Sequence, residues 1–486
     1  MNLLKIKSIE RHPLCVDLDG TLVKTDTLVE AVFALLRQNF LFVFKMAFWL
    51  LKGRLHFKMQ VFEHGNIDAS LLPYNREVLD LINNERARGR AIVLATASPH
   101  KIAESVSRHL GIFSSVLASD EKLNLKGKAK AALLVDRFGE KGFDYVGDSR
   151  HDLQVWSKAE RSYLVNASLL LEKRARQQSR VIRNIYREGS KWRPILRQIR
   201  VHQWAKNILV FIPMLLSEGI TNGGMWLSSM HAFFAFSLVA SSVYVLNDLL
   251  DLEADRKHPE NKKRPFASGD LPLTLGFTLF PSLIFLGFSV ASLLSAEFTL
   301  VLAAYLAFTT AYSFKLKKVA LADILLLASL YSWRVVAGAV ACQILISEWF
   351  FIFSSFFFLS LALVKRSAEL ILFKKTKGKA NARRAYTVED LPVLTAFGVS
   401  SGFLSILVLA LFLSTPEIKL NYKEPLILWA ILPLALYWVT SVWLKTLRGE
   451  IPSDPLVYAI KDRLSYLLGF SMMLIWMFAK GVIPAF

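Results

Sequence analysis

Hydrophobic residues are distributed unevenly along the 486-residue chain. Residues 1–206 mix charged and apolar positions, whereas the remainder consists of long apolar runs separated by short polar loops. A helix needs about 20 apolar residues to cross a bilayer. Runs near this length lie at residues 225–246, 273–294, 298–314, 320–342, 349–364, 393–414, 425–444 and 464–485. The pattern predicts a polytopic membrane region that follows a soluble N-terminal part.

Charge in the loops predicts how the chain crosses the membrane, because cytoplasmic loops are the basic ones. Lys and Arg gather in alternate loops, at residues 256–264, 315–318, 365–384 and 445–463. Segment 158–206 is also basic, so the shorter apolar run at 208–217 has to cross as a ninth span, extended by residues upstream of it. We therefore expect nine spans in the cell inner membrane, with the N-terminal domain in the cytoplasm and the C-terminus outside.

Composition narrows the class of partner. The net charge of +20 suits nucleic-acid binding, but the alternation of basic loops is typical of a membrane protein. Two Cys far apart in sequence give neither a disulfide framework nor a zinc site. The first residues lack the apolar core and cleavage site of a signal peptide. We expect a lipid bilayer and no nucleic acid as the partner.

The soluble part alternates short apolar runs with helical stretches, which predicts an α/β doubly wound parallel sheet. The strands are expected in PLCVDLDGTL (13–22), RAIVLATAS (90–98), SSVLAS (114–119) and FDYVGDS (143–149). Ligands of such sheets lie beyond the carboxyl ends of the strands. Asp17, Thr96 and Asp148 fall at those ends.

The residue types at these strand ends suit phosphoryl chemistry. One carboxylate can attack phosphorus, and a second one two positions later can protonate the leaving group. Carboxylates from the last strand can hold Mg²⁺ against the phosphate, while a hydroxyl and a Lys neutralise its remaining oxygens. Any one of these motifs is also compatible with an ordinary turn at the end of a strand.

Taken in order, the motifs resemble haloacid dehalogenase-type phosphatases over roughly residues 10–165. The resemblance implies Asp17 as nucleophile, Asp19 as acid and base, and Thr96 as a phosphate contact. In NLKGKAK it implies Lys130 as the phosphate-binding Lys, with Lys126 as the alternative. The implied Mg²⁺ ligands are Asp17, Asp148 and Asp152.

The segments around this domain are expected to meet the membrane surface. The insert at about 23–88 fits a small helical cap, and its stretch 31–51 is strongly apolar. We favour an amphipathic cap on the bilayer over a transmembrane hairpin, which would separate Asp17 from Asp148. The linker 166–206 is basic and predicts one or two amphipathic helices along the anionic leaflet.

The stretch NDLLDLEADRKHPENKKRPFASG, from Asn247 to Gly269, combines acids and bases at the mouth of an apolar run. If the helix continues through it, Asp248, Asp251 and Asp255 share one face. Clustered carboxylates repel each other unless a cation lies among them, and Mg²⁺ bound to a diphosphate fits this role. A solvated helix end is the alternative, although cytoplasmic helix ends usually carry Lys and Arg.

The pattern NDxxDxxxD followed by KKRPxASG resembles the first signature of UbiA-type intramembrane prenyltransferases, over residues 195–486. The resemblance implies an all-helical transmembrane bundle of about nine helices in a domain at 207–486. It also implies a site for Mg²⁺ and a diphosphate. The implied residues are Asp248, Asp251 and Asp255 for the metal, Asn247 beside them for substrate, and Lys262 and Arg264 for phosphate.

The second signature of that family is incomplete here. YSFKLKKVALADILLLASLYSWRVVAGA has a single Asp, Asp323, where the family shows an Asp-rich motif after YxxxK. Arg334 lies eleven residues later, about three helical turns away and on the same face. Arg334 either pairs structurally with Asp323 or binds an additional phosphate of the donor.

Three further stretches, RVHQWAKN, LALVKRSAEL and DPLVYAIKDRLSYLLG, resemble the decaprenyl-phosphate phosphoribosyltransferase subgroup. The resemblance implies phosphoribosyl diphosphate as donor, polyprenyl phosphate as acceptor and Mg²⁺ as cofactor. Transfer of a prenyl chain to an aromatic acceptor is the alternative. The further residues assigned to phosphate are Lys315 and Arg334, and those assigned to substrate are Asp323, Lys365 and Arg366.

Such a transfer leaves a 5-phosphate on the lipid-linked ribose, which a fused phosphatase can remove. The alternatives are a phosphatase for an unrelated phosphoester and a non-catalytic domain that regulates the membrane enzyme.

Overall fold

The computed structural model describes residues 12–121, 123–186, 192–217, 221–314, 316–375, 386–451, 455–459 and 461–481. The chain divides into two compact units, each described by itself. The first comprises Met1–Gln198 and Val245–Thr278, and the second comprises Ile199–Tyr244 and Leu279–Phe486. The Asp-rich stretch of the predicted membrane region therefore belongs to the same compact unit as the α/β domain.

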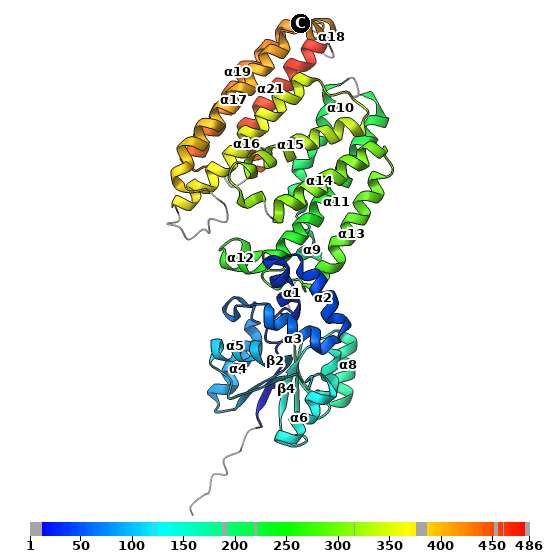
Figure 1. Ribbon diagram of the computed structural model, residues 1–486, viewed down its shortest axis with the longest axis vertical. Coiled ribbons are helices and arrows are strands. Elements are labelled where there is room, and N and C mark those ends of the chain that lie inside the picture. The colour runs from blue at the N-terminus through cyan, green and yellow to red at the C-terminus, as the bar shows by residue number, and fades with distance from the viewer. Residues whose placement is uncertain are drawn as a thin grey trace, which may run out of the picture. The chain divides into compact units, whose positions relative to one another are not determined.

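The first unit is built on a six-stranded sheet in which every pairing is parallel (Figure 1). The strand order is β3-β2-β1-β4-β5-β6, with crossovers typical of a doubly wound fold. The four predicted strands are confirmed, and two strands were not anticipated. The bounds are β1 Leu14–Val16, β2 Ile92–Pro99, β3 Ser115–Ser119, β4 Asp144–Gly147, β5 Arg161–Val165 and β6 Arg180–Ile185.

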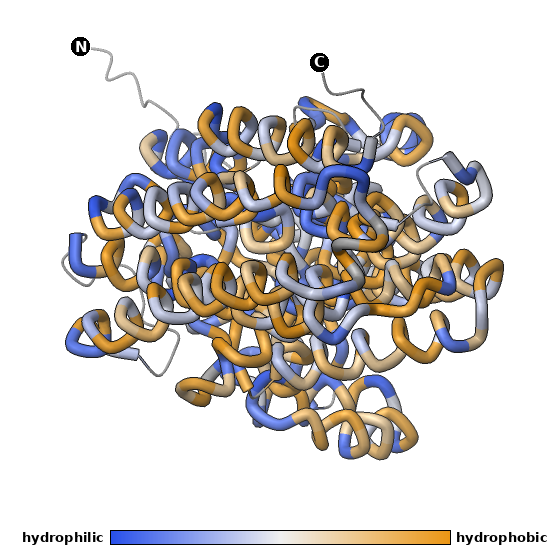
Figure 2. Tube along the Cα trace, turned by 90° about the horizontal axis from the view of Figure 1, so that it is seen from above, coloured by the Kyte–Doolittle hydropathy of each residue, from blue (hydrophilic) through white to orange (hydrophobic). Residues whose placement is uncertain are grey.

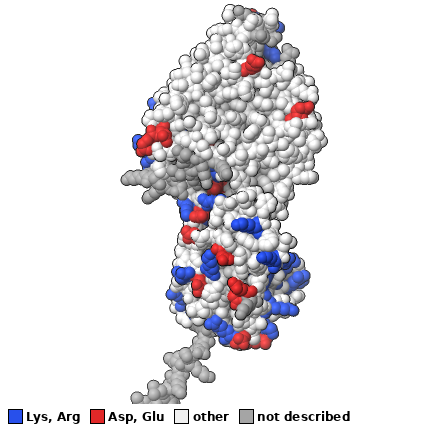
Figure 3. Space-filling view, in the orientation of Figure 1, with Lys and Arg blue, Asp and Glu red and all other residues white. Residues whose placement is uncertain are grey.

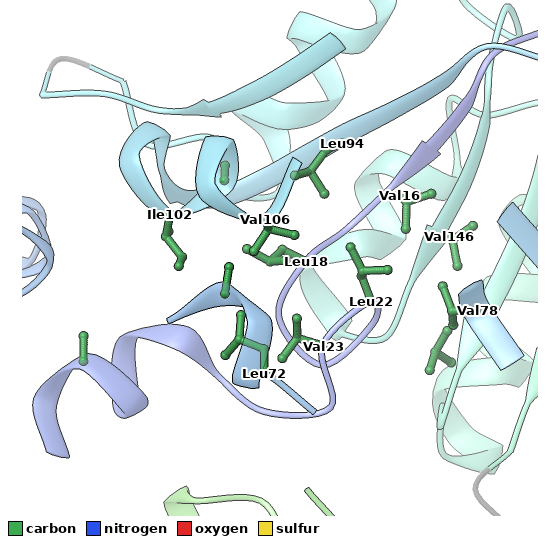
Figure 4. Packing of buried hydrophobic residues seen from close by; sticks show 14 of the residues in the cluster. Val16, Leu18, Leu22, Val23, Leu72, Val78, Leu94, Ile102, Val106 and Val146 are labelled. Atoms are coloured by element: carbon green, nitrogen blue, oxygen red, sulfur yellow. The ribbon is translucent and has the colours of Figure 1, made fainter. Parts of the chain in front are cut away.

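Alternating side chains of the strands fill a separate core on each face of the sheet. On β1, Leu14 and Val16 pack into one cluster and Cys15 into the other, as the two-residue period of a strand requires. Figure 4 shows part of the first cluster, in which Leu18 and Val106 lie close together. The helices that follow the strands are α4 Arg76–Ala87, α5 His100–Leu110, α6 Lys128–Phe138, α7 Leu153–Trp156 and α8 Leu169–Gln178.

The insert after β1 forms three helices, α1 Thr27–Gln38, α2 Phe42–Leu51 and α3 Arg54–His64. With ten residues, α2 is too short to span a bilayer, which needs about 20. It exposes large apolar side chains, with Phe44 at 70% and Leu51 at 86%. Association of this cap with a membrane stays a prediction.

The segment expected to form only amphipathic helices differs from that expectation. After α8 the chain forms strand β6, which pairs in parallel with β5, and then helix α9 Trp192–Gln198. The sequence RVIRNI places Val and Ile in a run that suits an edge strand. The first part of the basic segment is therefore an integral part of the α/β fold.

The second unit is helical, as expected for the apolar half of the chain, and Figure 2 shows its long helices as mainly hydrophobic. The face of this unit seen in Figure 3 carries few charged side chains, in contrast to the α/β unit. The long helices are α11 Gly223–Leu250, α13 Thr274–Ala291, α14 Ala296–Phe314, α15 Ala322–Ala341, α16 Glu348–Lys375, α17 Leu391–Leu413, α19 Ile431–Arg448 and α21 Arg463–Lys480. Shorter elements are η7 Val388–Asp390, α18 Pro416–Asn421, η8 Pro425–Ala430 and α20 Pro455–Ala459.

Each of the eight predicted long runs coincides with one of these helices. Among the described residues, six helical segments are long and apolar enough to cross a membrane; α16 and α21 are not among them. The expected ninth span is not among them either: residues 208–217 lie in a 3₁₀ helix, η3 Val201–Phe211, and the five-residue α10 Ile212–Leu216. That this run crosses together with residues upstream of it stays a prediction.

Candidate active sites

Three carboxylates meet at the carboxyl ends of β1 and β4. The Asp17 backbone N–H donates to the Val146 carbonyl at 3.0 Å, which fixes the end of β1 beside β4. Carboxylate oxygens of Asp17, Asp148 and Asp152 all lie within 4.8 Å of one another. The structure thus brings together the three residues predicted as Mg²⁺ ligands of the phosphatase-like domain.

Gly20 allows this close approach. Its φ of +74° favours glycine, and a Cβ at this position would overlap with the Asp148 carboxylate. The glycine of the DLDGTL motif therefore has a steric role beside its conformational one.

Lys130 and Tyr145 bind the carboxylates through an ion pair and hydrogen bonds. The Lys130 ammonium forms an ion pair with Asp17 at 2.9 Å and donates to the Tyr145 hydroxyl at 2.8 Å. That hydroxyl donates to Asp152 Oδ1 at 2.9 Å. Lys126, the alternative, is exposed at the cleft. The geometry favours Lys130, and it adds Tyr145, which sequence reasoning missed although it lies in the quoted FDYVGDS.

Asp19 is held on the side of the cap. It accepts from the backbone N–H of Thr27 at 2.7 Å and from the Ser98 hydroxyl at 2.6 Å. Thr96 is fully buried, and its hydroxyl accepts from the Ser98 backbone N–H at 2.9 Å. The hydroxyl that lines the cleft is that of Ser98, so the geometry favours Ser98 over Thr96 as the phosphate contact; both residues lie in β2.

Burial and mutual repulsion raise the pKa values of Asp17 and Asp148. Desolvation raises the pKa of Asp17 to about 6, although Lys130 opposes the shift. Desolvation, together with the charges of Asp152 and Asp17, raises the pKa of Asp148 well above its usual value. Three carboxylates that converge this closely repel one another unless a cation lies among them, and their hard oxygens suit Mg²⁺. The residues present therefore fit the divalent ion.

A cleft of about 1400 Å³ opens above this cluster. The three clustered carboxylates, Lys130 and Ser98 form part of its lining. Other parts come from the cap, from α9, from residues 124–127 and 166–169, and from the segment 270–274 that leads into α13.

The Asp-rich stretch does not form the continuous helix that we expected. Helix α11 ends at Leu250, Asp251 has φ −99° and ψ 15°, and a second short helix, α12 Leu252–Lys257, begins after it. The break at Asp251 means that the three aspartates do not share the face of one helix.

Arg264 neutralises two of these aspartates. Its Nη1 donates to Asp248 Oδ1 at 3.1 Å and to Asp255 Oδ2 at 2.7 Å. Both aspartates are buried, and they also accept from Gln198 at 2.9 Å and from Asn261 at 3.2 Å, respectively. An arginine thus occupies the position between carboxylates where we predicted a metal ion.

The remaining residues of this predicted site are less enclosed. Asn247 and Asp251 are half-buried and Lys262 is exposed. Within the described part of the chain, Asp17, Asp148 and Asp152 are the one group whose carboxylates converge closely enough to hold a metal ion. Lys315 lies outside the described residues.

In the helical unit, Asp323 is bound by Arg366 and not by Arg334. Arg366 Nε donates to Asp323 Oδ2 at 2.5 Å and Nη2 donates to Oδ1 at 3.0 Å, and both side chains are buried. Tyr312 also donates to Asp323, at 2.8 Å, and Glu369 pairs with Arg366 at 2.7 Å. The structural pairing of Arg334 with Asp323 is therefore wrong, because a second arginine from α16 takes that carboxylate.

Arg334 has its own buried partners. Its Nε donates to Asn207 Oδ1 at 2.8 Å and its Nη2 to the Tyr305 hydroxyl at 2.9 Å, and Asn207 in turn donates to Ser237 at 2.9 Å. These partners are neutral groups, and none of them is a carboxylate. Asn207 lies in the quoted RVHQWAKN, whereas Tyr305 carried no signal in the sequence. Lys365, on α16, is half-buried.

Comparison with known proteins agrees with both halves. Residues 208–479 match the UbiA prenyltransferase family, and residues 14–156 match the haloacid dehalogenase-like hydrolases. The uncharacterized protein y4nM of Sinorhizobium fredii is 36% identical over 476 residues, which cover 96% of this chain and 91% of that protein. The decaprenyl-phosphate phosphoribosyltransferase of Mycobacterium tuberculosis is 38% identical over 189 residues, which cover 37% of this chain and 62% of that protein. A UbiA homolog from Archaeoglobus fulgidus, solved with GPP and Mg²⁺, matches with a TM-score of 0.46 at 14% identity, covering 58% of this chain and 99% of that one.

The chain belongs to the UbiA prenyltransferase family and carries an N-terminal haloacid dehalogenase-like domain. It is an integral, multi-pass membrane enzyme that joins a transferase family to a hydrolase family.

Proposed function

We propose that the chain transfers a 5-phosphoribosyl group from phosphoribosyl diphosphate to a polyprenyl phosphate, and that its N-terminal domain removes the 5-phosphate from the product. The observation that carries the first part is the engagement of Asp323 by Arg366 on both carboxylate oxygens. The lone carboxylate of the second signature is thereby neutralised by protein. Arg334 lies on the same helix as Asp323 and is also buried. These arginines support a donor that carries more phosphate than a prenyl diphosphate does.

The name of the mycobacterial relative supports the same donor and acceptor, since that protein is a decaprenyl-phosphate phosphoribosyltransferase. Mg²⁺ held by Asp248, Asp251 and Asp255 would neutralise the diphosphate. Arg264 donates to Asp248 and Asp255 in the structure. It would bind the diphosphate if the two carboxylates bound a metal ion instead. We further propose an inner-membrane location with the N-terminal domain in the cytoplasm and the C-terminus outside, from the charges of the loops.

In the transfer step, an oxygen of the lipid phosphate attacks C1 of the ribose, and the bond from C1 to the diphosphate oxygen breaks. Diphosphate leaves with the electron pair, and the basic residues of the site stabilise its developing negative charge. The acceptor is already an anion, so no protein base has to remove a proton. Lys262, Lys365 and the arginines named above are the proposed phosphate and substrate contacts.

In the hydrolytic step, the Asp17 carboxylate attacks the 5-phosphorus, and the bond to the ribose 5-oxygen breaks. Asp19 gives its proton to that oxygen. Water then attacks the aspartyl-phosphate, Asp19 takes a proton from the water, and phosphate is released. Lys130 and Ser98 would hold the phosphoryl oxygens, and Mg²⁺ at Asp17, Asp148 and Asp152 would supply charge neutralisation.

Labelling of lipid tests the transfer. Membranes with the wild-type chain, incubated with [¹⁴C]phosphoribosyl diphosphate and polyprenyl phosphate, are expected to form an organic-soluble labelled lipid. Asp251→Asn should abolish the label, whereas the matched Glu253→Gln on the exposed side of α12 should retain it. Absence of labelled lipid from the wild type contradicts the proposal. Transfer of labelled prenyl diphosphate to an aromatic acceptor would instead support the alternative, ordinary prenyl transfer.

A further inference from the structure

The phosphatase cleft is larger than a small phosphomonoester requires. Sites for small ligands usually measure about 300–1,000 Å³, and this one reaches about 1400 Å³. Other parts of its lining are basic or apolar and do not belong to the carboxylate cluster. They are Arg193, Ile195 and Arg197 of α9, Leu50 and Phe57 of the cap, and Leu271, Pro272 and Leu273 before α13.

The segment before α13 is fixed to the cap by close contacts. Arg256 of α12 forms a two-pronged ion pair with Glu30 of α1, at 2.7 and 2.8 Å, and both side chains are buried. Arg256 also donates to the carbonyl of Ala267 at 2.9 Å. A buried, bidentate arginine–carboxylate pair is geometrically specific. It therefore holds the stretch 256–267 in one position against the first helix of the cap.

Two packing contacts extend this attachment. Phe33 of α1 and Phe277 of α13 stack with ring centroids 5.1 Å apart. A Cβ on Gly269 would come within 2.8 Å of the Lys24 Cβ and 3.2 Å of a Pro73 ring carbon, so only glycine fits there. The segment 270–274, which directly follows the diphosphate motif, is thus a wall of the phosphatase cleft.

The arginines of α9 give this cleft a second basic region. Arg197 Nη2 donates to the carbonyl of Lys263 at 2.9 Å, which anchors α9 to the same wall. In the described part of the chain, neither Arg193 nor Arg197 forms an ion pair with a carboxylate. Arginine suits phosphate better than lysine does, because its planar group can bind two oxygens at once.

We propose that the cleft has an accessory subsite, formed by Arg193, Arg197 and the apolar wall, for a second phosphate and the start of an alkyl chain on the same substrate. The phosphatase would then select a phosphomonoester whose other end is a phosphodiester to a lipid. This inference rests on the phosphatase part of the proposed function and specifies its substrate class. Glu30 and Arg256 are positioning residues, since they hold the wall and do not touch the substrate.

Three synthetic substrates test the subsite. They are ribose 5-phosphate, ribose 1,5-bisphosphate, and ribose 1,5-bisphosphate that carries a geranyl ester on its 1-phosphate. Phosphate release by the full chain in detergent is expected to rise in kcat/KM along this series. Arg193→Gln/Arg197→Gln should lower kcat/KM for the second and third substrates by about tenfold, equivalent to about 1.4 kcal/mol. The change for ribose 5-phosphate should stay within about threefold and confirms that the variant is folded.

A second pair of variants tests the wall. Arg256→Gln should raise KM for the geranyl substrate with little change in kcat, and the charge-reversed pair Glu30→Arg/Arg256→Glu should restore part of the loss. The control is Arg37→Gln, because Arg37 and Glu253 also join α1 to α12, but at 3.4 Å and on the surface. It should behave as the wild type does.

Equal rates on all three substrates overturn the proposal, and so does an equal loss on all three in the arginine variant. If the α9 variant instead weakens only the binding of anionic vesicles, the arginines contact lipid headgroups and the subsite is refuted. Because these substrates are synthetic, the result is independent of transfer: a chain that forms no labelled lipid but shows the series keeps this inference and loses the proposed transferase.

Discussion

The first compact unit contains two clusters of three aspartates, and they are neutralised in different ways. Asp17, Asp148 and Asp152 are set at strand ends and converge within 4.8 Å, and the Lys130 ammonium pairs with Asp17. Asp248 and Asp255 are instead bridged by Arg264, and Asp251 lies at a helix break between them. The strand ends hold three carboxylates close enough for a shared metal ion. At the helix ends, an arginine instead lies between two of the carboxylates.

The strongest way to separate the two clusters is to remove their cations one at a time. Lys130→Met takes away the charge beside the nucleophile and should lower phosphate release by about 10²–10³-fold, the usual effect of losing one stabilising group. Lipid labelling should persist. The measurement is phosphate release from ribose 5-phosphate by the purified chain.

Lys126→Met is the matched control, since Lys126 lines the same cleft but is exposed. A larger loss with Lys126→Met than with Lys130→Met would show that the wrong lysine has been placed beside Asp17.

A smaller effect is expected from crowding the first cluster. Gly20→Ala places a methyl group against Asp148 and strains a backbone with φ +74°, so phosphate release should fall by at least about tenfold through displacement of the carboxylate. Gly53→Ala has φ +112° but no atom within 4 Å. Its cost should be limited to about 1–2 kcal/mol of strain. Melting curves and phosphate release distinguish the two; equal activity losses would contradict the steric role of Gly20.

The second cluster should respond in the opposite sense to loss of its cation. Arg264 competes with a metal for Asp248 and Asp255, so Arg264→Gln should lower the Mg²⁺ concentration for half-maximal lipid labelling, by roughly tenfold or about 1.4 kcal/mol. The titration is made at saturating phosphoribosyl diphosphate. Lys263→Gln, whose exposed ammonium lies 3.5 Å from Glu260, is the control. A raised requirement for Mg²⁺ in Arg264→Gln would show that Arg264 supports the metal site and does not compete with it.

The smallest effect concerns the magnitude of dependence on metal. The packed strands that carry Asp17 and Asp148 set the positions of these carboxylates. Excess chelator should therefore stop phosphate release without lowering the melting temperature of the α/β domain by more than a few degrees. Unfolding on chelation would mean that the metal is structural, in contrast to the packed cores on both faces of the sheet.

Local patterns predicted most of this architecture, because apolar period and motif order depend on neighbouring residues. The four strands around DLDGTL, ATAS and GDSRHD and the eight long apolar runs follow from such patterns. The fifth and sixth strands did not, since β6 lies at an edge and only part of it is buried. The ninth span rests on loop charge, which constrains topology but supplies no apolar length, and it stays a prediction.

Side-chain partners were the least predictable part. Asp323 and Arg334 share a helical face by spacing, yet Asp323 is bound by Arg366, which lies 43 residues away in sequence. Asn207 and Tyr305 reach Arg334 from other helices in the same way. Helical spacing within one segment cannot reveal such tertiary contacts. That Ser98 and not Thr96 lines the cleft is similarly decided by how β2 lies in the sheet.

The lipid made by the nucleophile variant tests the central claim most directly. Membranes with Asp17→Asn and with the exposed-surface control Asp136→Asn are supplied with labelled phosphoribosyl diphosphate and polyprenyl phosphate, and the lipids are separated by chromatography before and after treatment with an added phosphatase. We predict that the control yields ribosyl lipid without a 5-phosphate, while Asp17→Asn accumulates a more acidic lipid that the added phosphatase converts to the same product. Identical lipids from both variants would contradict the account.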